Sequence, residues 1–147
     1  SLAASCATLG DVVRAPEFSV ASGRQAELRP SLTGATIRVW ANVRNPNPLG
    51  LTLARVSANL FLESTRAANV DFPMGMPLQA NQDTIVPIDI TIRWADLPGL
   101  ADVASRLLTR SSIGYRLDGP VTVDAGVLGQ PSFGPNTLLR GDVAVKR

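Results

Sequence analysis

The chain has 147 residues, of which 45% are hydrophobic and 18% are charged, and this is the size and composition of one folded domain. It contains no histidine and a single cysteine, Cys6, which excludes histidine-dependent catalytic triads, histidine-ligated metals, CxxC redox pairs and internal disulfides. The formal net charge is only +2, and acidic residues lie between the scattered arginines, which argues against a nucleic-acid-binding surface.

Residues 1–15 are expected to form an N-terminal tail ahead of a single domain over residues 16–147. The small residues before Cys6 resemble the end of a bacterial lipoprotein signal peptide, although Ala3 stands where such signals usually carry leucine. One interpretation is therefore a lipidated Cys6 that tethers the protein to the bacterial cell envelope. The alternative is an unmodified cysteine in an ordinary tail of a cytoplasmic protein. No segment approaches the roughly 20 apolar residues of a membrane-spanning helix, so the sequence suggests attachment to a membrane only through a lipid on Cys6.

Short strands separated by turns are predicted for most of the chain. Residues 36–45 alternate between apolar and polar side chains, which is typical of a half-buried strand. Residues 56–62 and 86–92 repeat this pattern, and residues 18–21 and 143–145 are weaker candidates. The residues expected to face the core are Ile37, Val39, Ala41, Val43, Val56, Ala58, Leu60, Leu62, Val86, Ile88, Ile90 and Ile92.

One stretch changes to a helical period. Apolar residues between Leu97 and Leu108 recur at helical spacing, which predicts an α-helix over about residues 96–110. Asp96 is the expected N-cap, and Pro98 is tolerated because the first turn has no partner for its missing N–H. Such a helix would close one end or one face of a sheet.

Residues 113–123 predict a β-hairpin. The pair Asp118-Gly119 supplies the positive φ angles of a tight type I′ turn, and apolar residues alternate on both sides of it. Pro120 has no N–H, so the returning strand is expected to begin there or to lie at a sheet edge.

These elements predict a mostly β fold. The most economical architecture is an antiparallel β-sandwich of about seven strands, of the immunoglobulin or fibronectin III type, with one α-helix. The segment 69–79 is rich in proline and glycine and is expected to be a connection that holds at most a short strand.

The most unusual local feature is the run Asn45-Pro46-Asn47-Pro48 at the end of the first long predicted strand. Each asparagine precedes a proline, which keeps it out of the α region, and each side chain can bond nearby backbone as an Asx-turn. A strand followed by such a double turn makes a stiff corner, so the motif by itself predicts a structural turn.

The order of segments around this corner resembles the late-embryogenesis-abundant group 2 family, also called the WHy (water stress and hypersensitive response) domain family. After the corner, a Leu-x-Leu and an alternating strand follow, and a Leu-x-Ala-Asn segment later leads into the next long strand. Gln82 and Asp83 stand where the family usually has glycine. The resemblance covers about residues 25–147. Its motif positions are Asn45, Pro46, Asn47, Pro48, Ala80, Asn81, Tyr115 and Gly119.

The resemblance implies a non-enzymatic, folded protein of water-stress or desiccation tolerance, with no cofactor, metal or catalytic residue. The 45% hydrophobic content agrees with a folded protector, because disordered protectants are poorer in apolar residues. The expected partners are partly unfolded client proteins, which it would shield from inactivation or aggregation. The alternative function is an envelope-anchored lipoprotein module that binds one specific protein or surface polymer. The oligomeric state stays open.

Carboxylate chemistry is an enzyme class that the composition leaves open, because glycosidases need two carboxylates across a cleft. The candidates are Asp89, Asp96, Asp118 and Asp124. The predicted turn accounts for Asp118 and the predicted cap accounts for Asp96, while Asp89 faces outward on its strand. Catalysis is therefore not expected.

The aromatic residues offer two weaker candidates. Trp40 and Trp94 could form a sugar-stacking platform, although single tryptophans on sheets more often serve packing. Tyr115 is expected to lie in the core or in a cross-strand pair and not to act as a nucleophile.

Overall fold

The computed structural model describes residues 13–97, 105–106 and 109–146, and strands make up most of them. In chain order the strands are β1 (Glu17–Val20), β2 (Glu27–Pro30), β3 (Gly34–Arg44), β4 (Leu51–Leu62), β5 (Thr65–Leu78), β6 (Asp83–Arg93), β7 (Ser112–Asp124) and β8 (Ser132–Val145). Two short 3-10 helices, η1 (Trp94–Asp96) and η2 (Gly126–Leu128), follow β6 and β7. Among the described residues, no helix is long and apolar enough to cross a membrane.

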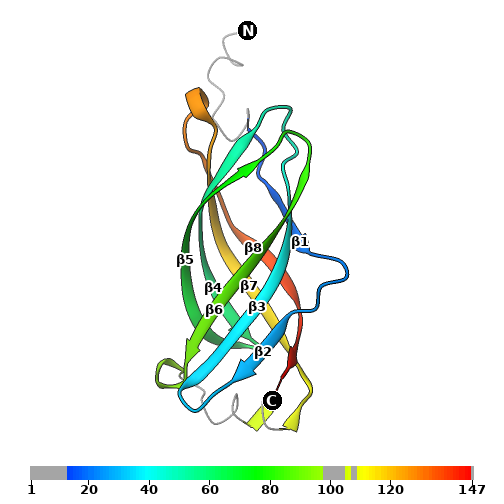
Figure 1. Ribbon diagram of the computed structural model, residues 1–147. Helices are drawn as coiled ribbons and strands as arrows, with labels where there is room; N and C mark the ends of the chain where they lie inside the picture. Colours follow the sequence, from blue (N-terminus) through cyan, green and yellow to red (C-terminus); the bar gives the residue numbers. More distant parts are fainter. Residues whose placement is uncertain (1–12, 98–104, 107–108, 147) are drawn as a thin grey trace.

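The eight strands form one continuous mixed sheet (Figure 1). β6 pairs along the whole length of β3. The β3 residues that pair with β1 and with β2 also pair with β6, so β1 and β2 must lie on the opposite side of β3 from β6. β2 then pairs in parallel with β8, and β7, β4 and β5 follow in antiparallel order. In the described part of the chain, β1, β5 and β6 each pair with one strand only, and the long strands β5 and β6 present two free edges.

The prediction of a mostly β fold is confirmed, but the sandwich of two separate sheets is not. The sheet is continuous because Glu27 and Leu28 of β2 pair with Ala144 and Val145 of β8. β2 has only four residues and was not predicted as a strand. This short strand joins what would otherwise be two antiparallel groups of strands.

The inward faces of the strands share one hydrophobic core. The alternation predicted for the three long strands is confirmed, since the side chains expected to face the core are all buried, from Leu60 at 0% exposed to Ala58 at 7%. The two weaker strand candidates are also present, one as β1 and the other as the end of β8.

The predicted hairpin over residues 113–123 is wrong, because β7 runs straight through Asp118 and Gly119. β7 lies between β4 and β8 and pairs with both, so each half of the proposed hairpin already has other partners. Gly119 is not among the residues with positive φ. A Cβ on Gly119 would collide with the carbonyl oxygen of Ser57 and lie 2.6 Å from the Cα of Ala58, so glycine is required here for close strand approach.

The segment 69–79 is also different from the prediction, since nearly all of it belongs to the long strand β5. Gly75 has a φ of 57° where the pairing with β4 is irregular, which is the geometry of a β-bulge. Pro73 and Pro77 fit because β5 is an edge strand, and proline is accepted there when its nitrogen faces away from the neighbouring strand.

The predicted helix over residues 96–110 lies largely outside the described residues, which leave out 98–104 and 107–108. At its start, Asp96 ends η1 and Leu97 is extended, with φ −93° and ψ 118°, so Asp96 is not the N-cap of a helix that continues from it. At its end, the N–H of Arg110 donates to the carbonyl of Arg106 at 2.9 Å, which is one helical turn.

Candidate functional site

Asn45 and Asn47 form a buried hydrogen-bonded pair at the corner between β3 and β4, with exposed fractions of 0% and 1%. The side-chain oxygen of Asn45 accepts from the backbone N–H of Asn47 at 3.0 Å and from its side-chain amide at 2.9 Å. The amide of Asn45 donates to the carbonyls of Leu49 at 2.9 Å and Leu78 at 3.1 Å. The Asx-turn predicted at Asn45 is thus present, and both ends of this side chain are satisfied.

Asn47 attaches the N-terminal segment to this corner. Its side-chain oxygen accepts from the N–H of Arg14 at 2.7 Å, and its amide donates to the carbonyl of Arg14 at 2.9 Å. The predicted Asx-turn is absent at Asn47. Its side chain instead bonds to both the N–H and the carbonyl of Arg14, as the backbone of a neighbouring strand would. Pro46 is half-buried and Pro48 is exposed beside this pair.

The turn between β5 and β6 packs onto the same corner. The N–H of Asn81 donates to the carbonyl of Asn47 at 3.1 Å, and the N–H of Asn45 donates to the carbonyl of Gln82 at 3.0 Å. Asn81 has a φ of 56°, so it fills the left-handed position of this turn, and half-buried Ala80 precedes it. The motif residues 45–48 and 80–81 therefore meet in one structural junction.

Tyr115 and Gly119 lie apart from that junction, on β7. Tyr115 is 4% exposed and stands opposite Gly141 of β8, which confirms its predicted place in the core and in a cross-strand pair. Its hydroxyl group is buried and has no hydrogen-bond partner among the described residues. Burial, and then the charge of Asp142, raise the pKa of Tyr115.

Replacing Tyr115 by phenylalanine should raise the free energy of unfolding by about 1 kcal/mol, because a buried hydroxyl without a partner is costly. The unfolded chain releases the phenol proton at lower pH than the folded chain does. The free energy of unfolding of the wild-type protein therefore falls as the pH rises above about 10. That of Tyr115→Phe lacks this contribution, because phenylalanine has no phenol proton. Urea unfolding at neutral pH and above pH 10 would measure both effects. A destabilised variant, or a stability difference that does not grow at high pH, would contradict the expectation.

Two of the candidate carboxylates are held by surface partners. Asp89 faces outward as predicted and binds Arg38 through two hydrogen bonds, of 2.6 and 3.0 Å. These hydrogen bonds lower the pKa of Asp89. Asp118 does not form a turn; it accepts from Arg116 at 2.7 Å and from the hydroxyl of Thr137 at 2.8 Å. Both carboxylates therefore have roles in cross-linking strands.

The other two carboxylates do not form a catalytic pair with them. Asp124 accepts from the N–H of Gly126 at 2.9 Å and so caps the turn after β7. Asp96 lies in η1, in the hollow described below. Among the described residues, no group of three or more His, Cys, Asp or Glu side chains could hold a metal ion.

The two tryptophans do not share a platform. Trp40 lies in the middle of β3, and the guanidinium of Arg24 covers its ring at 4.5 Å from the centroid, with that of Arg38 at 5.8 Å. Trp94 lies in η1, beyond the end of β6, and its indole N–H donates to the carbonyl of Ser31 at 3.0 Å. The ring of Trp40 is thus covered by arginines, while the indole of Trp94 is held by a backbone carbonyl in another part of the fold.

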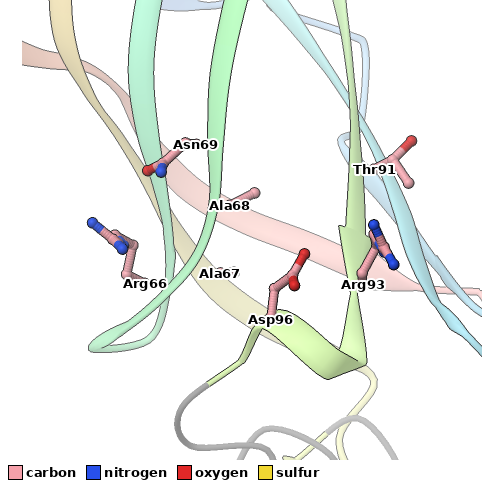
Figure 2. A pocket seen from close by; sticks show the side chains of 7 residues that line it. All are labelled: Arg66, Ala67, Ala68, Asn69, Thr91, Arg93 and Asp96. Atoms are coloured by element: carbon pink, nitrogen blue, oxygen red, sulfur yellow. The ribbon is translucent and has the colours of Figure 1, made fainter.

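A hollow of about 360 Å³ lies between the free edges β5 and β6, and we call it the edge cleft (Figure 2). It is lined by Arg66, Ala67, Ala68, Asn69, Thr91, Arg93 and Asp96. In Figure 2, Asp96 stands between the two strands, Arg66 lies on the β5 side and Arg93 on the β6 side. The space exists because the apolar side chains that line it are only alanines.

The edge cleft also carries uncompensated charge. Within the described residues, the side chains of Arg66, Arg93 and Asp96 have no hydrogen bond, ion pair or ring contact. By contrast, Arg38 and Arg44 on the outer face of β3 are paired with aspartates of β6. The sequence did not indicate this site, because it shows neither that 69–79 is an edge strand nor that β5 and β6 face each other.

Cys6, the candidate for lipidation, lies outside the described residues. Its modification and the location of the protein in an envelope therefore stay predictions.

Comparison with known structures shows the same fold in proteins of low sequence identity. A solution structure from Arabidopsis thaliana aligns with a TM-score of 0.69 at 18% identity, over 92% of this chain and 85% of that one. A solution structure described as a late embryogenesis abundant (LEA) protein gives 0.60 at 20% identity, over 91% and 73%. A crystal structure of a protein from Archaeoglobus fulgidus gives 0.50 at 11% identity, over 92% and 98%.

A search of curated protein sequences gives no match. The family model LEA_2, described as late embryogenesis abundant protein, matches residues 41–136, which is more than half of the chain. The matched segment begins just before the Asn-Pro-Asn corner and ends within β8. The resemblance inferred from the sequence motifs is thereby confirmed, and the chain belongs to the LEA_2 family of late embryogenesis abundant proteins.

Proposed function

We propose that this protein is a non-enzymatic protector that shields partly unfolded client proteins from inactivation or aggregation when water is withdrawn. Membership of the LEA_2 family supports a stress-related role of the LEA type. The observation that supports client binding is the incomplete burial of the apolar face of β5. Its inward side chains Val70, Phe72, Met74 and Met76 remain half-buried, although they pack against the core.

The inward side chains of β5 are less covered than those of the other long edge strand. On β6, Ile88 and Ile90 are only 2% exposed, although this strand also pairs on one side only. Accessible apolar side chains next to a free strand edge are the features that partly unfolded chains bind. Methionine suits such a surface because its flexible side chain adapts to different partners.

The proposal predicts that a labile enzyme dried or frozen with this protein recovers more activity than with an equal mass of an inert protein. The double substitution Met74→Gln, Met76→Gln should lower that recovery, because it makes the accessible face of β5 polar. The matched control is Leu32→Gln, which removes an apolar side chain that is 99% exposed in another part of the surface. Recovery equal to that with the inert protein would overturn the proposal.

A second proposal concerns attachment to an envelope through a lipid on Cys6, in which the domain binds one protein or surface polymer. It is favoured by the way in which the chain enters the domain. Val13 is fully buried and Arg14 is bonded to Asn47, so a tether ahead of them would hold the domain at the junction. Mass spectrometry of the protein from its native source should show an acyl mass on Cys6, and an unmodified thiol there would exclude the tether.

A further inference from the structure

We propose that the edge cleft accepts an added β-strand from a client protein, in which acidic side chains alternate with apolar ones. This inference rests on the proposed client-binding function and names the chemistry of the segment that is bound. It depends on three features of the described residues, which are the unpaired strand edges, the position of the prolines and the uncompensated charge.

The strand edges can pair only in the part that lines the edge cleft. Proline lacks an N–H, and within a sheet its nitrogen must face a free edge. Pro73 and Pro77 on β5 and Pro87 on β6 therefore remove donors from the free edges in the parts of these strands nearest the turn that joins them. The segments 65–72 and 88–93 contain no proline, and they include the cleft-lining residues of both strands. An extended segment can form backbone hydrogen bonds there, as in other cases of strand addition.

The alternation of side chains along the edges defines the pattern of the added strand. Ile90 and Ile92 of β6 point into the core, while Thr91 and Arg93 are exposed. A strand beside β6 would likewise turn every second residue toward the core and the others toward solvent. The inward residues would enter the space beside Ala68 and need to be apolar.

The outward residues of the added strand would lie between two arginines. Arg66 stands on one side of the edge cleft and Arg93 on the other, and neither has a partner among the described residues. Side chains directly opposite each other on neighbouring strands are close enough for opposite charges to attract, so glutamate or aspartate is favoured at these positions. Asp96, which lies between the two strands, is available to accept from a backbone N–H of the bound segment.

Fluorescence anisotropy with a labelled short peptide of alternating valine and glutamate tests the proposal on the full chain. The peptide should bind, and a peptide with lysine in place of glutamate should bind about tenfold more weakly or not at all. The double substitution Arg66→Gln, Arg93→Gln should weaken binding of the glutamate peptide by about tenfold. Arg140→Gln is the control, because Arg140 is exposed on β8, away from the edge cleft.

Filling the space tests the site without changing its charge. Ala68→Phe should abolish binding, because the larger side chain occupies the position of an inward residue of the peptide. Unfolding measurements establish that this variant is folded. If Ala68→Phe does not fold, the arginine variants still decide the question.

Four outcomes would overturn the inference. If the arginine variants bind the glutamate peptide equally well, the arginines do not contribute to binding. If these variants bind it more tightly, the arginines are edge charges that prevent strand addition. If those variants instead associate with themselves in size-exclusion chromatography, the occupant of the edge cleft is a second copy of the chain. Failure of the wild-type protein to bind any peptide, while it still protects a dried enzyme, would overturn the inference and leave the proposed function standing. Failure to protect the enzyme would overturn the proposed function.

Discussion

Replacing Asn45 by alanine should lower the free energy of unfolding by about 4 kcal/mol, because it leaves several buried polar groups without partners. The substitution removes the acceptor of the Asn47 N–H and the donor to the carbonyls of Leu49 and Leu78. Water cannot replace these bonds readily, since Asn45 is fully buried. Urea unfolding followed by circular dichroism would measure the loss.

Two further variants make this expectation specific. Asn42→Ala removes a nearby asparagine, close to the end of β3, whose side chain has one exposed hydrogen bond, to Asp83 at 3.3 Å. This variant should change stability by less than about 0.5 kcal/mol. Asn45→Asp keeps the shape and the acceptor but places a carboxylate oxygen against the carbonyls of Leu49 and Leu78, so it should be destabilised as well. Equal stabilities of Asn45→Ala and Asn42→Ala would mean that the buried junction contributes little.

Replacing Gly119 by alanine should cost about 3 kcal/mol or more, because the added methyl group collides with the backbone of β4. The nearest atoms belong to the main chain of Ser57 and Ala58, in the middle of a strand that is paired on both sides. Such atoms cannot turn away as a flexible side chain can. Thermal unfolding of the variant would show the effect as a large fall in Tm.

Gly50→Ala is the matched control for this substitution. Gly50 is exposed before β4, and a Cβ there would lie 3.7 Å from the carbonyl oxygen of Leu78, which is ordinary contact. Its stability should stay within about 0.5 kcal/mol of the wild type. If Gly119→Ala unfolds at the same temperature as Gly50→Ala, the close approach of β7 to β4 is not needed.

The parts of the fold that were predicted correctly are strands with one buried face and one face exposed to solvent. In β3 and β6 the two-residue period of side chains follows directly from this contrast, so Val39 and Ile88 could be placed in the core from the sequence. The Asx-turn at Asn45 was also predictable, because it depends on residues two positions apart. These features are local, and the sequence carries local information directly.

The parts that were predicted wrongly depend on neighbours distant in the sequence. Asp118-Gly119 has the composition of a turn, but pairing with both β4 and β8 keeps the backbone extended. The prolines of β5 suggested a connection because the sequence did not reveal that this strand lies at an edge. The bonds from Asn47 to Arg14 are equally non-local.

The edge cleft could not be predicted for the same reason. Arg66 and Arg93 are two of many dispersed arginines in the sequence, and their residue types do not distinguish them from Arg38. Only the order of strands shows that Arg38 faces an aspartate across a paired strand, while the other two face an open edge. The absence of histidine, by contrast, is visible directly in the composition.

The parallel pairing of β2 with β8 also affects how the chain acquires its structure. Leu28 near the beginning pairs with Val145 near the end, and the N–H of Lys146 donates to the carbonyl of Leu28 at 2.8 Å. During synthesis β8 leaves the ribosome after β2, so the sheet cannot become continuous until β8 has been made. Domains dominated by such distant contacts fold in about milliseconds to seconds, which is slow for their size. In a newly made chain the edge of β2 that pairs with β8 therefore stays open until β8 is available.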